Sequence, residues 1–457
     1  MTVAEQFAAF AVQTNYDDLS DPVRTQIKTL VLDTLGCAIG SMAAEPIAMI
    51  REHTEEFGGA PLCTLIGGGK TTPEQAAFLN TSLIRYLDFN DGYMGKRATC
   101  HPSDNLGALL AAGEYADADG KTLMTSLALA YEIQCRLCDV AGFENNGFDQ
   151  FTAGAYAVAS GASRILGMDA KKTAHAIAIS GVRQNPLFVT RVGQISNWKG
   201  FAYGGGAHTV LHSTFLAKRG VTGPLSLFEG QSGVFDSVTG EFELDWTDTK
   251  LEKMRQVSVK RYTAGLHSQP AVEGALDLRA KHNIDPAQIE RIDVGLYERA
   301  FFIMGSGKAG ARKHIRDKET ADHSLPYVVS AALLDGQLMP EQYKVERILR
   351  DDVQALFRKV HTFSSDDLTA RYPAEAATTV KITLTDGTSF ETEKSAYEGH
   401  FTCPMQWDTI VEKFTLLATP YTSDGLRAEI IDAVSNLESV SVRDLANLLA
   451  QVDMPAA

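Results

Sequence analysis

The hydrophobic residues of this 457-residue chain change their spacing twice. From Ala4 to about Arg255 they recur every three or four residues, as in "NLGALLAAGEYADADGKTLMTSLALAYEIQ", where Gly and Asp separate two predicted helices. Near Arg255 the spacing changes to period two, which is typical of strands. Helical spacing returns after about Ala396, in "WDTIVEKFTLLATP" and "SVRDLANLLAQV".

The two changes predict a mostly α-helical protein with an insert. Residues 1–256 and 396–457 should form one large, discontinuous helical domain, and residues 257–395 a smaller α+β lid domain. Two units also suit the length, because single hydrophobic cores stop growing near roughly 250–300 residues. The cleft between two such domains is the default place to expect a ligand.

The insert contains three segments with strand spacing: "RQVSVKRY", "IERIDVGLYE" and "TTVKITLTDGTSFETE". The last carries Asp386-Gly387, a dipeptide favoured at the tip of a hairpin. Helices are expected around residues 270–281 and 326–334. Alternating strands and helices make the insert α+β.

The composition limits the classes of partner. A formal net charge of −15 disfavours nucleic acid, whose phosphates require a basic surface. The N-terminal segment "MTVAEQFAAFAVQTNYDD" lacks the basic region of a secretion signal, and no apolar run approaches the roughly 20 residues of a membrane span. We expect a cytoplasmic protein that binds neither nucleic acid nor membranes, and any anionic ligand must meet a local cluster of cations.

Cysteines and glycine runs give no cofactor site. Cys135 and Cys138 form a C-x-x-C pair without the second pair that a zinc ribbon needs, inside an apolar helical pattern, so buried structural thiols are favoured. "LIGGGKTT" lacks the first glycine of a phosphate-binding loop and predicts an ordinary turn. "YGGGAH" lacks the strand and spacing of a dinucleotide loop, so its glycines are expected to let the backbone approach another helix or a ligand.

One polar loop concentrates the residue types of proton-transfer chemistry. "LDFNDGYMGKRATCHPSDN" contains Asp88, Asp91 and a single histidine, His101, directly before a proline. Imidazole gives or takes a proton near neutral pH, and neighbouring carboxylates orient the ring or bind a substrate hydroxyl. The alternative is a solvated turn whose acids cap the helix expected near Ser103.

Four further segments carry candidate residues, each with a plain structural alternative. Lys199 in "SNWKGFAYGGG" could hold its ammonium at a pocket wall, and Lys260 in "VSVKRYTAGLHSQPAVE" is predicted at the end of a strand, where most lysines are merely solvated. His267 follows seven residues later, before a helix. "ADHSLPYVVSAALLDGQ" places His323 and Tyr327 at a helix start, where a capping contact is the alternative.

Taken in order, five segments resemble the MmgE/PrpD family, which includes 2-methylcitrate dehydratase, cis-aconitate decarboxylase and iminodisuccinate epimerase. The segments are "LDFNDGY…HPSDN", "NWKGFAYGGGAHTVLHSTFLAKRGVTGP", "KRYTAGLHSQPAVEGA", "ADHSLPYVVSAALLDG" and "GHFTCPMQWDTIVEKF". The resemblance covers nearly the whole chain. It implies a helical domain built from both chain ends, an α+β lid, a homodimer, and catalysis without a metal or other cofactor.

The resemblance also implies roles. Reactions of the family remove a proton from, or return it to, a carbon next to a carboxylate, so cations must hold the carboxylate while a base reaches the carbon. Lys199, Lys260 and His323 are the expected substrate-binding residues. His101 is the expected base or acid, and the leaving hydroxyl would take its proton from one of three groups: Asp88, His267 or Tyr327.

Two departures from the family pattern bear on the reaction. The usual D-F-D-D-T stands here as residues 88–92, Asp-Phe-Asn-Asp-Gly, and Phe148, Asp149 and Gln150 stand where some members carry a histidine. Both disfavour a decarboxylase. The expected function is dehydration of 2-methylcitrate, a step of propionate metabolism, or of a related hydroxy-tricarboxylate. The alternatives are an epimerase or isomerase of an amino- or hydroxy-dicarboxylate, a decarboxylase, or a carboxylate-binding dimer without catalysis.

Overall fold

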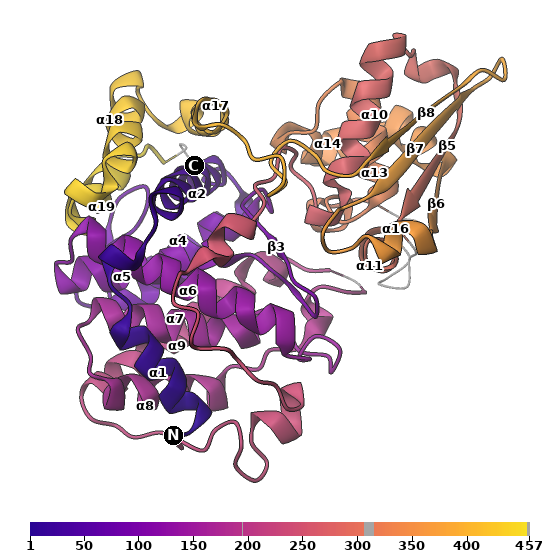
Figure 1. The fold of residues 1–457 in the computed structure, drawn as a ribbon. Coiled ribbons are helices and arrows are strands. Elements are labelled where there is room, and N and C mark those ends of the chain that lie inside the picture. Colours follow the sequence, from indigo (N-terminus) through magenta and orange to yellow (C-terminus); the bar gives the residue numbers. More distant parts are fainter. Residues whose placement is uncertain (194, 306–314, 455–457) are drawn as a thin grey trace. The chain divides into compact units, whose positions relative to one another are not determined.

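Residues 1–193, 195–305 and 315–454 are described by a computed structural model (Figure 1). Two compact units divide the chain. The larger comprises Met1–Phe188, Gly200–Val257 and Gln406–Ala457, and the smaller comprises Val189–Lys199 and Ser258–Met405.

Helices build the larger unit. They are α1 (Val3–Gln13), α2 (Asp21–Gly40), α3 (Glu45–Glu56), α4 (Pro73–Tyr86), α5 (Leu106–Ala116), α6 (Gly120–Val140), α7 (Phe151–Ile165), α8 (Ala170–Arg183), most of α9 (Trp198–Lys218), α17 (Trp407–Ala418), α18 (Asp424–Ser435) and α19 (Val442–Leu449). Two short antiparallel pairs join them: β1 (Cys63–Thr64) with β2 (Lys70–Thr71), and β3 (Tyr93–Met94) with β4 (Thr99–Cys100).

The core of the larger unit joins both ends of the chain. Helix α17 packs on α2, and α6 packs on α7, where the thiols of Cys135 and Cys138 are buried as predicted. The predicted break between two helices is confirmed: Asp117 ends α5 in the left-handed conformation, and the Asp119 carboxylate caps α6 by accepting from the Thr122 N–H. Local capping therefore sets these boundaries.

The glycine runs act as the sequence predicts. Residues 65–69 form the turn between β1 and β2. In α9, a Cβ on Gly204 would lie 2.7 Å from the Phe78 carbonyl oxygen of α4. The absence of a side chain at Gly204 therefore lets α9 and α4 pack closely.

The smaller unit contains a four-stranded sheet in the order β6-β5-β7-β8. The strands are β5 (Ile289–Leu296), β6 (Val360–Ser364), β7 (Thr378–Leu384) and β8 (Ser389–Lys394); β5 and β6 are parallel, and the other pairs are antiparallel. Gly387, with φ +87°, lies in the β7–β8 turn, so the predicted hairpin is confirmed.

Helices of the smaller unit include the two that the sequence predicts, α10 (Gln269–His282) and α13 (Leu325–Asp335), and α10 lies against β7 and β8 (Figure 1). Its described residues also form five short α-helices: α11 (Glu298–Ala300), α12 (Lys318–Ala321), α14 (Val345–Ile348), α15 (Asp351–Leu356) and α16 (Asp366–Ala370).

The strand predicted over "RQVSVKRY" is wrong. Glu252–Gln256 forms a 3-10 helix, and the residues that follow form no β-strand in the described part of the chain, although the Val259 N–H donates to the Gly399 carbonyl at 2.8 Å. Gly399 has φ +107°, outside strand geometry, so no ladder can continue there. Lys260 consequently lies in a buried extended segment rather than at a strand end.

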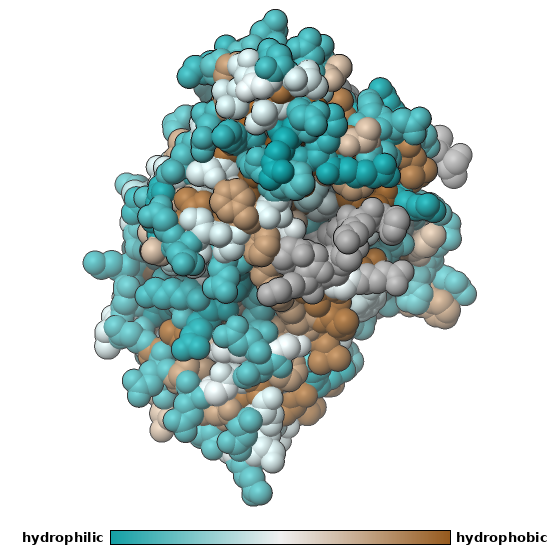
Figure 2. All heavy atoms as spheres, turned by 90° about the vertical axis from the view of Figure 1, so that its right-hand side faces the viewer, coloured by the Kyte–Doolittle hydropathy of each residue, from teal (hydrophilic) through white to brown (hydrophobic). Residues whose placement is uncertain are grey.

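The face of the molecule shown in Figure 2 is largely hydrophilic, and its hydrophobic residues gather mainly around and below the centre of the view. Among the described residues, no single helix is long and apolar enough to span a membrane; the bent pair α2 and α3, at 91°, meets the criteria by length and composition alone.

Candidate functional site

The polar loop of the larger unit starts at a buried ion pair. Asp88 follows α4 with φ +54°, a left-handed conformation uncommon for a residue other than glycine. Arg85, in the last turn of α4, donates from Nη1 to Asp88 Oδ1 at 2.6 Å, and its Nε lies 3.6 Å from Asp104 Oδ2. All three side chains are buried, so the two carboxylates share the single positive charge of Arg85, which fixes the start of the loop.

The next two loop residues are tied to the turn at Pro102–Asn105. Asn90 Nδ2 donates to Ser103 Oγ and to Asp104 Oδ1, each at 2.8 Å. Asp91 Oδ1 accepts from the Ser103 hydroxyl at 2.6 Å, and its Oδ2 accepts from the Tyr131 hydroxyl at 2.7 Å. Burial raises the pKa of Asp91 to about 6, although these hydrogen bonds oppose the rise.

His101 is held at two points within this network. Its backbone N–H donates to Gln150 Oε1 at 2.8 Å, and its Nδ1 lies 2.6 Å from the Asp91 carbonyl oxygen. A carbonyl oxygen only accepts hydrogen bonds, so Nδ1 must carry a proton and the neutral ring has its lone pair on Nε2. This is the tautomer that a general base at Nε2 requires.

A buried lysine supports the loop from α17. The Lys413 ammonium donates to the Phe89 carbonyl oxygen at 2.8 Å, lies 2.7 Å from Asp33 Oδ1, and is 3.7 Å from the centre of the Phe89 ring. Helices from both ends of the chain, α2 and α17, thereby position this loop.

In the smaller unit, a break between two helices presents Asp322 and His323. Asp322 caps the C-terminus of α12, with its N–H bonded to the Lys318 carbonyl, and Ser324 caps the N-terminus of α13 by accepting from the Tyr327 N–H. The cap of α13 is therefore Ser324, and His323 is left for other contacts.

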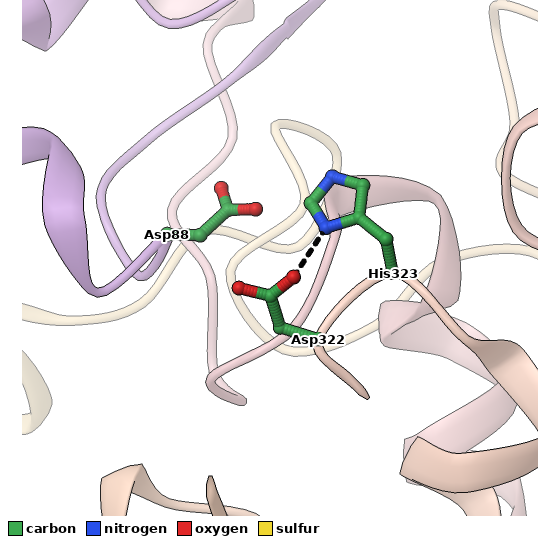
Figure 3. A group of neighbouring side chains, drawn as sticks. All are labelled: Asp88, Asp322 and His323. Atoms are coloured by element: carbon green, nitrogen blue, oxygen red, sulfur yellow. Dashed lines mark hydrogen bonds and ion pairs between the residues drawn. The ribbon is translucent and has the colours of Figure 1, made fainter. Parts of the chain in front are cut away.

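Three groups that can carry positive charge surround the Asp322 carboxylate. Lys199 Nζ lies 2.9 Å from Oδ1, Lys318 Nζ lies 2.8 Å from Oδ2, and His323 Nδ1 lies 2.6 Å from Oδ1, as Figure 3 shows for the histidine. Burial alone would raise the pKa of Asp322, but these charges outweigh it and hold the pKa well below its usual range. Asp322 is therefore an anion at neutral pH.

His267 is a neutral ring in a cationic neighbourhood. Burial lowers its pKa well below the usual value, and nearby Arg299, His323 and Lys260 lower it further. Its Nδ1 lies 2.5 Å from the Tyr297 hydroxyl, whose own pKa burial raises, so this contact joins two neutral groups. The neutral ring can donate or accept a hydrogen bond but does not attract an anion.

Tyr327 hydrogen-bonds to the backbone of its own unit. Its hydroxyl donates to the Gln342 carbonyl oxygen, and burial raises its pKa. The hydroxyl is thus protonated at neutral pH, as an acid must be, but it is engaged with a carbonyl. Its role as the acid stays a prediction.

The candidate residues divide between the units. Asp88 and His101 lie in one network of the larger unit, and the smaller unit contains Lys199, Lys260, His267, His323 and Tyr327. Lys199 and His323 meet around Asp322, while Lys260 and His267 are electrostatic neighbours.

Asp322 and His323 are residue types that bind metals, but two ammonium groups on the carboxylate compete with a cation there.

Family models match most of the chain. The MmgE/PrpD N-terminal domain matches residues 5–247, and the MmgE/PrpD C-terminal domain matches residues 262–439. The chain belongs to the MmgE/PrpD family.

Relatives with assigned activities are similar over most of their length. The 2-methylcitrate dehydratase of Escherichia coli K12 is 28% identical, over 82% of both chains. An alkylcitrate dehydratase of a fungal species (strain ATCC 74256) is 27% identical, over 93% of this chain and 90% of its own. The human cis-aconitate decarboxylase is 25% identical, over 96% and 92%. These names cover two reactions, dehydration and decarboxylation.

Asn90 and Gln150, at the two places where we expect the chain to depart from the family pattern, both make defined contacts. Asn90 donates to Asp104 beside Arg85, where an aspartate would place a third carboxylate next to those of Asp88 and Asp104. Gln150, at the segment where some members of the family carry a histidine, accepts the N–H of His101. Both replacements thus hold the loop that carries His101.

Sequence reasoning missed the partners of the candidate residues: Arg85, Gln150, Tyr297, Lys318 and Asp322. The one signal in the sequence was the acid directly before a histidine in "ADHS", since such a carboxylate can orient the ring.

Proposed function

We propose that this MmgE/PrpD protein is a lyase that acts on a small polycarboxylate, most favourably by dehydrating 2-methylcitrate or a related hydroxy-tricarboxylate without a cofactor. The observation that carries the proposal is the buried Lys199 ammonium, 2.9 Å from the His323 ring, in a chain of net charge −15. Such a cation gives an anionic substrate a local binding site, and imidazole is the side chain suited to move its proton.

The proposed roles follow the needs of the reaction. Lys199 and Lys260 bind substrate carboxylates and thereby stabilise the charge that develops when the neighbouring carbon loses its proton. His101, whose neutral ring has its lone pair on Nε2, is the base or the acid. The leaving hydroxyl takes a proton from a neutral acid, for which His267, Tyr327 and a protonated Asp88 are the candidates.

Dehydration is favoured over decarboxylation by the relatives' names and by Gln150. Two of the three relatives are dehydratases, and Phe148, Asp149 and Gln150 stand in the segment where some members carry a histidine. An epimerase or isomerase of an amino- or hydroxy-dicarboxylate would use the same removal of the proton without loss of water.

The test is a panel assay with the purified full chain. 2-Methylcitrate, longer alkylcitrates and citrate should give an absorbance near 240 nm from the unsaturated acid, whereas cis-aconitate should release no carbon dioxide. Binding of the whole panel by calorimetry without any turnover would instead identify a carboxylate-binding protein.

Chelation tests the absence of a cofactor. Dialysis against EDTA should leave the rate unchanged, because the cations that the proposal uses are lysine side chains. A rate that falls on dialysis and returns with a divalent cation would overturn the cofactor-free proposal.

A further inference from the structure

The contact between Asp322 and His323 defines where the proton sits on this ring. Nδ1 and Oδ1 are 2.6 Å apart, and Asp322 is fully buried and ionised. An unprotonated nitrogen would bring its lone pair against the charged oxygen at this distance. A proton must therefore lie between the two atoms, donated by Nδ1.

Lys199 offers a competing arrangement, because its Nζ lies 2.9 Å from the same Nδ1. If the ammonium donated to Nδ1, the ring proton would move to Nε2, and the 2.6 Å contact with Asp322 would become a repulsion. Lys199 also lies 2.9 Å from Asp322 Oδ1, so its proton has a charged acceptor there. The arrangement in which both groups donate to the carboxylate is favoured.

The resulting tautomer places the lone pair of the neutral His323 ring on Nε2. A neutral ring is a poor binder of carboxylates but a good proton acceptor, and an adjacent carboxylate stabilises the imidazolium that forms when the proton arrives. We propose that His323 exchanges the substrate proton at Nε2 and that Asp322 is the positioning residue that fixes and stabilises its ring. This inference rests on the proposed function and changes the role of His323 from substrate binding to proton transfer.

The step balances within the substrate and the histidine. The C–H bond next to the substrate carboxylate breaks, its electron pair stays on the substrate as the enolate, and the proton forms an N–H bond at Nε2. Nδ1 keeps its own proton toward Asp322. When the enolate pair forms the double bond, the C–O bond breaks and the hydroxyl leaves as water with a proton from a separate acid.

The structural alternative is that Asp322 serves only to hold Lys199 and Lys318. Both lysines lie within 2.9 Å of its oxygens, so replacement of Asp322 would also disturb the cations that grip the substrate. A single variant cannot separate these roles, but a double-mutant cycle can, because residues that act through one another are not additive.

The experiment compares His323→Ala, Asp322→Asn and the double variant, in the assay that detects turnover by wild-type protein. His323→Ala should lower kcat by roughly 10²–10⁴-fold with a smaller change in KM. Asp322→Asn should lower kcat by about 10–150-fold, the effect of losing one hydrogen bond to a charged group. In the His323→Ala background the same substitution should change kcat little, because the ring that Asp322 positions is then absent. Free imidazole should restore part of the rate of His323→Ala and of the double variant equally, since it needs no positioning.

Controls distinguish folding and the proposed function from the inference. His361→Ala removes an exposed histidine of β6 in the same unit and should keep the wild-type rate. If His323→Ala does not fold, as judged by melting, His323→Gln keeps a polar side chain of similar length and replaces it in the cycle.

Two results would overturn the inference while leaving the proposed function intact. One is a folded His323 variant with wild-type turnover. The other is that Asp322→Asn still lowers kcat in the His323→Ala background but no longer lowers it in the Lys199→Ala background. That pattern would show that Asp322 acts through Lys199. Wild-type protein inactive on every polycarboxylate would overturn the proposed function, and the inference with it.

Discussion

His101 in the larger unit and His323 in the smaller unit are both held by Nδ1, but with different partners. In the larger unit, His101 Nδ1 lies 2.6 Å from a backbone carbonyl, that of Asp91; in the smaller, His323 Nδ1 lies 2.6 Å from the Asp322 carboxylate. Both partners select the same tautomer. The carboxylate also stabilises a ring that has gained a proton, whereas the neutral carbonyl does so much less.

The difference extends to how each unit uses its buried acids. In the larger unit, Asp88, Asp91 and Asp104 accept from Arg85, Ser103, Tyr131 and Asn90, and so order the loop. In the smaller unit, the buried Asp322 gathers Lys199, Lys318 and His323. Buried carboxylates therefore have different uses in the two units: the three of the larger unit order a loop, and Asp322 of the smaller unit holds charged groups together.

The largest expected effect is on turnover, at His101. If His101 moves the proton, His101→Ala should lower kcat by roughly 10²–10⁴-fold while the substrate still binds, as measured by steady-state kinetics and calorimetric titration. If His101 only orders the loop before Pro102, melting temperature, binding and turnover should decline together. If His101→Ala is stable and turns over normally, His101 does not move the proton, and a residue of the smaller unit must do so.

The support of that loop gives the next effect. Lys413→Met should lower the free energy of unfolding by about 3–5 kcal/mol, because it removes the cation from the buried Asp33. Denaturant titration measures the loss. Adding Asp33→Asn should recover part of it, since the charge is then removed as well; a double variant no more stable than Lys413→Met would contradict the ion-pair explanation.

Asp91 predicts a dependence of stability on pH. Its pKa is raised by burial from 3.8 to about 6, so the native state binds the proton more tightly than the unfolded state. Its contribution is fully present below pH 3.8, falls as pH rises, and is lost above about 6, a change of about 3 kcal/mol. Asp91→Asn should remove this part of the pH dependence and be at least as stable as wild type at pH 8.

Asp322 should contribute a pH dependence of stability with the opposite sign to that of Asp91. Because its pKa is lowered, its contribution is present above the ordinary range of an aspartate and is lost as pH falls below it. The prediction for Asp91 would be wrong if Asp91→Asn lost as much stability between pH 4 and 6 as the wild type does. The raised pKa of Asp91 could not then be the cause of that loss.

Lys199 carries the smallest effect. Lys199→Ala should weaken substrate binding by about 10–150-fold, since a hydrogen bond to a charged group contributes roughly 1.5–3 kcal/mol. Calorimetry measures this directly, and Lys250→Ala, in an exposed loop of the larger unit, is the matched control. Unchanged affinity would show that the ammonium serves Asp322 alone.

Local sequence predicts local structure well in this chain. The helix break at Asp117 and Asp119 and the β7–β8 turn at Gly387 follow from capping and turn chemistry, which depend on neighbours in the sequence. The segment "RQVSVKRY" has strand spacing yet forms no strand among the described residues, because a strand also needs a neighbouring strand to pair with, and Gly399, which accepts from the Val259 N–H, does not lie in one.

The sequence predicts which residue types contribute to the candidate site, but it does not predict which residues they contact. His101 and His323 stand out as histidines next to acids or proline, but their tautomers depend on the Asp91 carbonyl and the Asp322 carboxylate. The pairing of Lys199 with Asp322 joins residues 123 positions apart. No spacing rule connects them, since tertiary folding alone brings them together.

The proposed function depends on one step, the transfer of a proton at the carbon next to a substrate carboxylate. The most direct measurement incubates it with the unsaturated product of the dehydration in deuterated water and follows the hydrated acid by NMR. One solvent deuterium should appear on that carbon, and both His101→Ala and His323→Ala should lower the rate at which it is incorporated. Binding of the unsaturated acid with no deuterium incorporated and no hydration would contradict the proposed function.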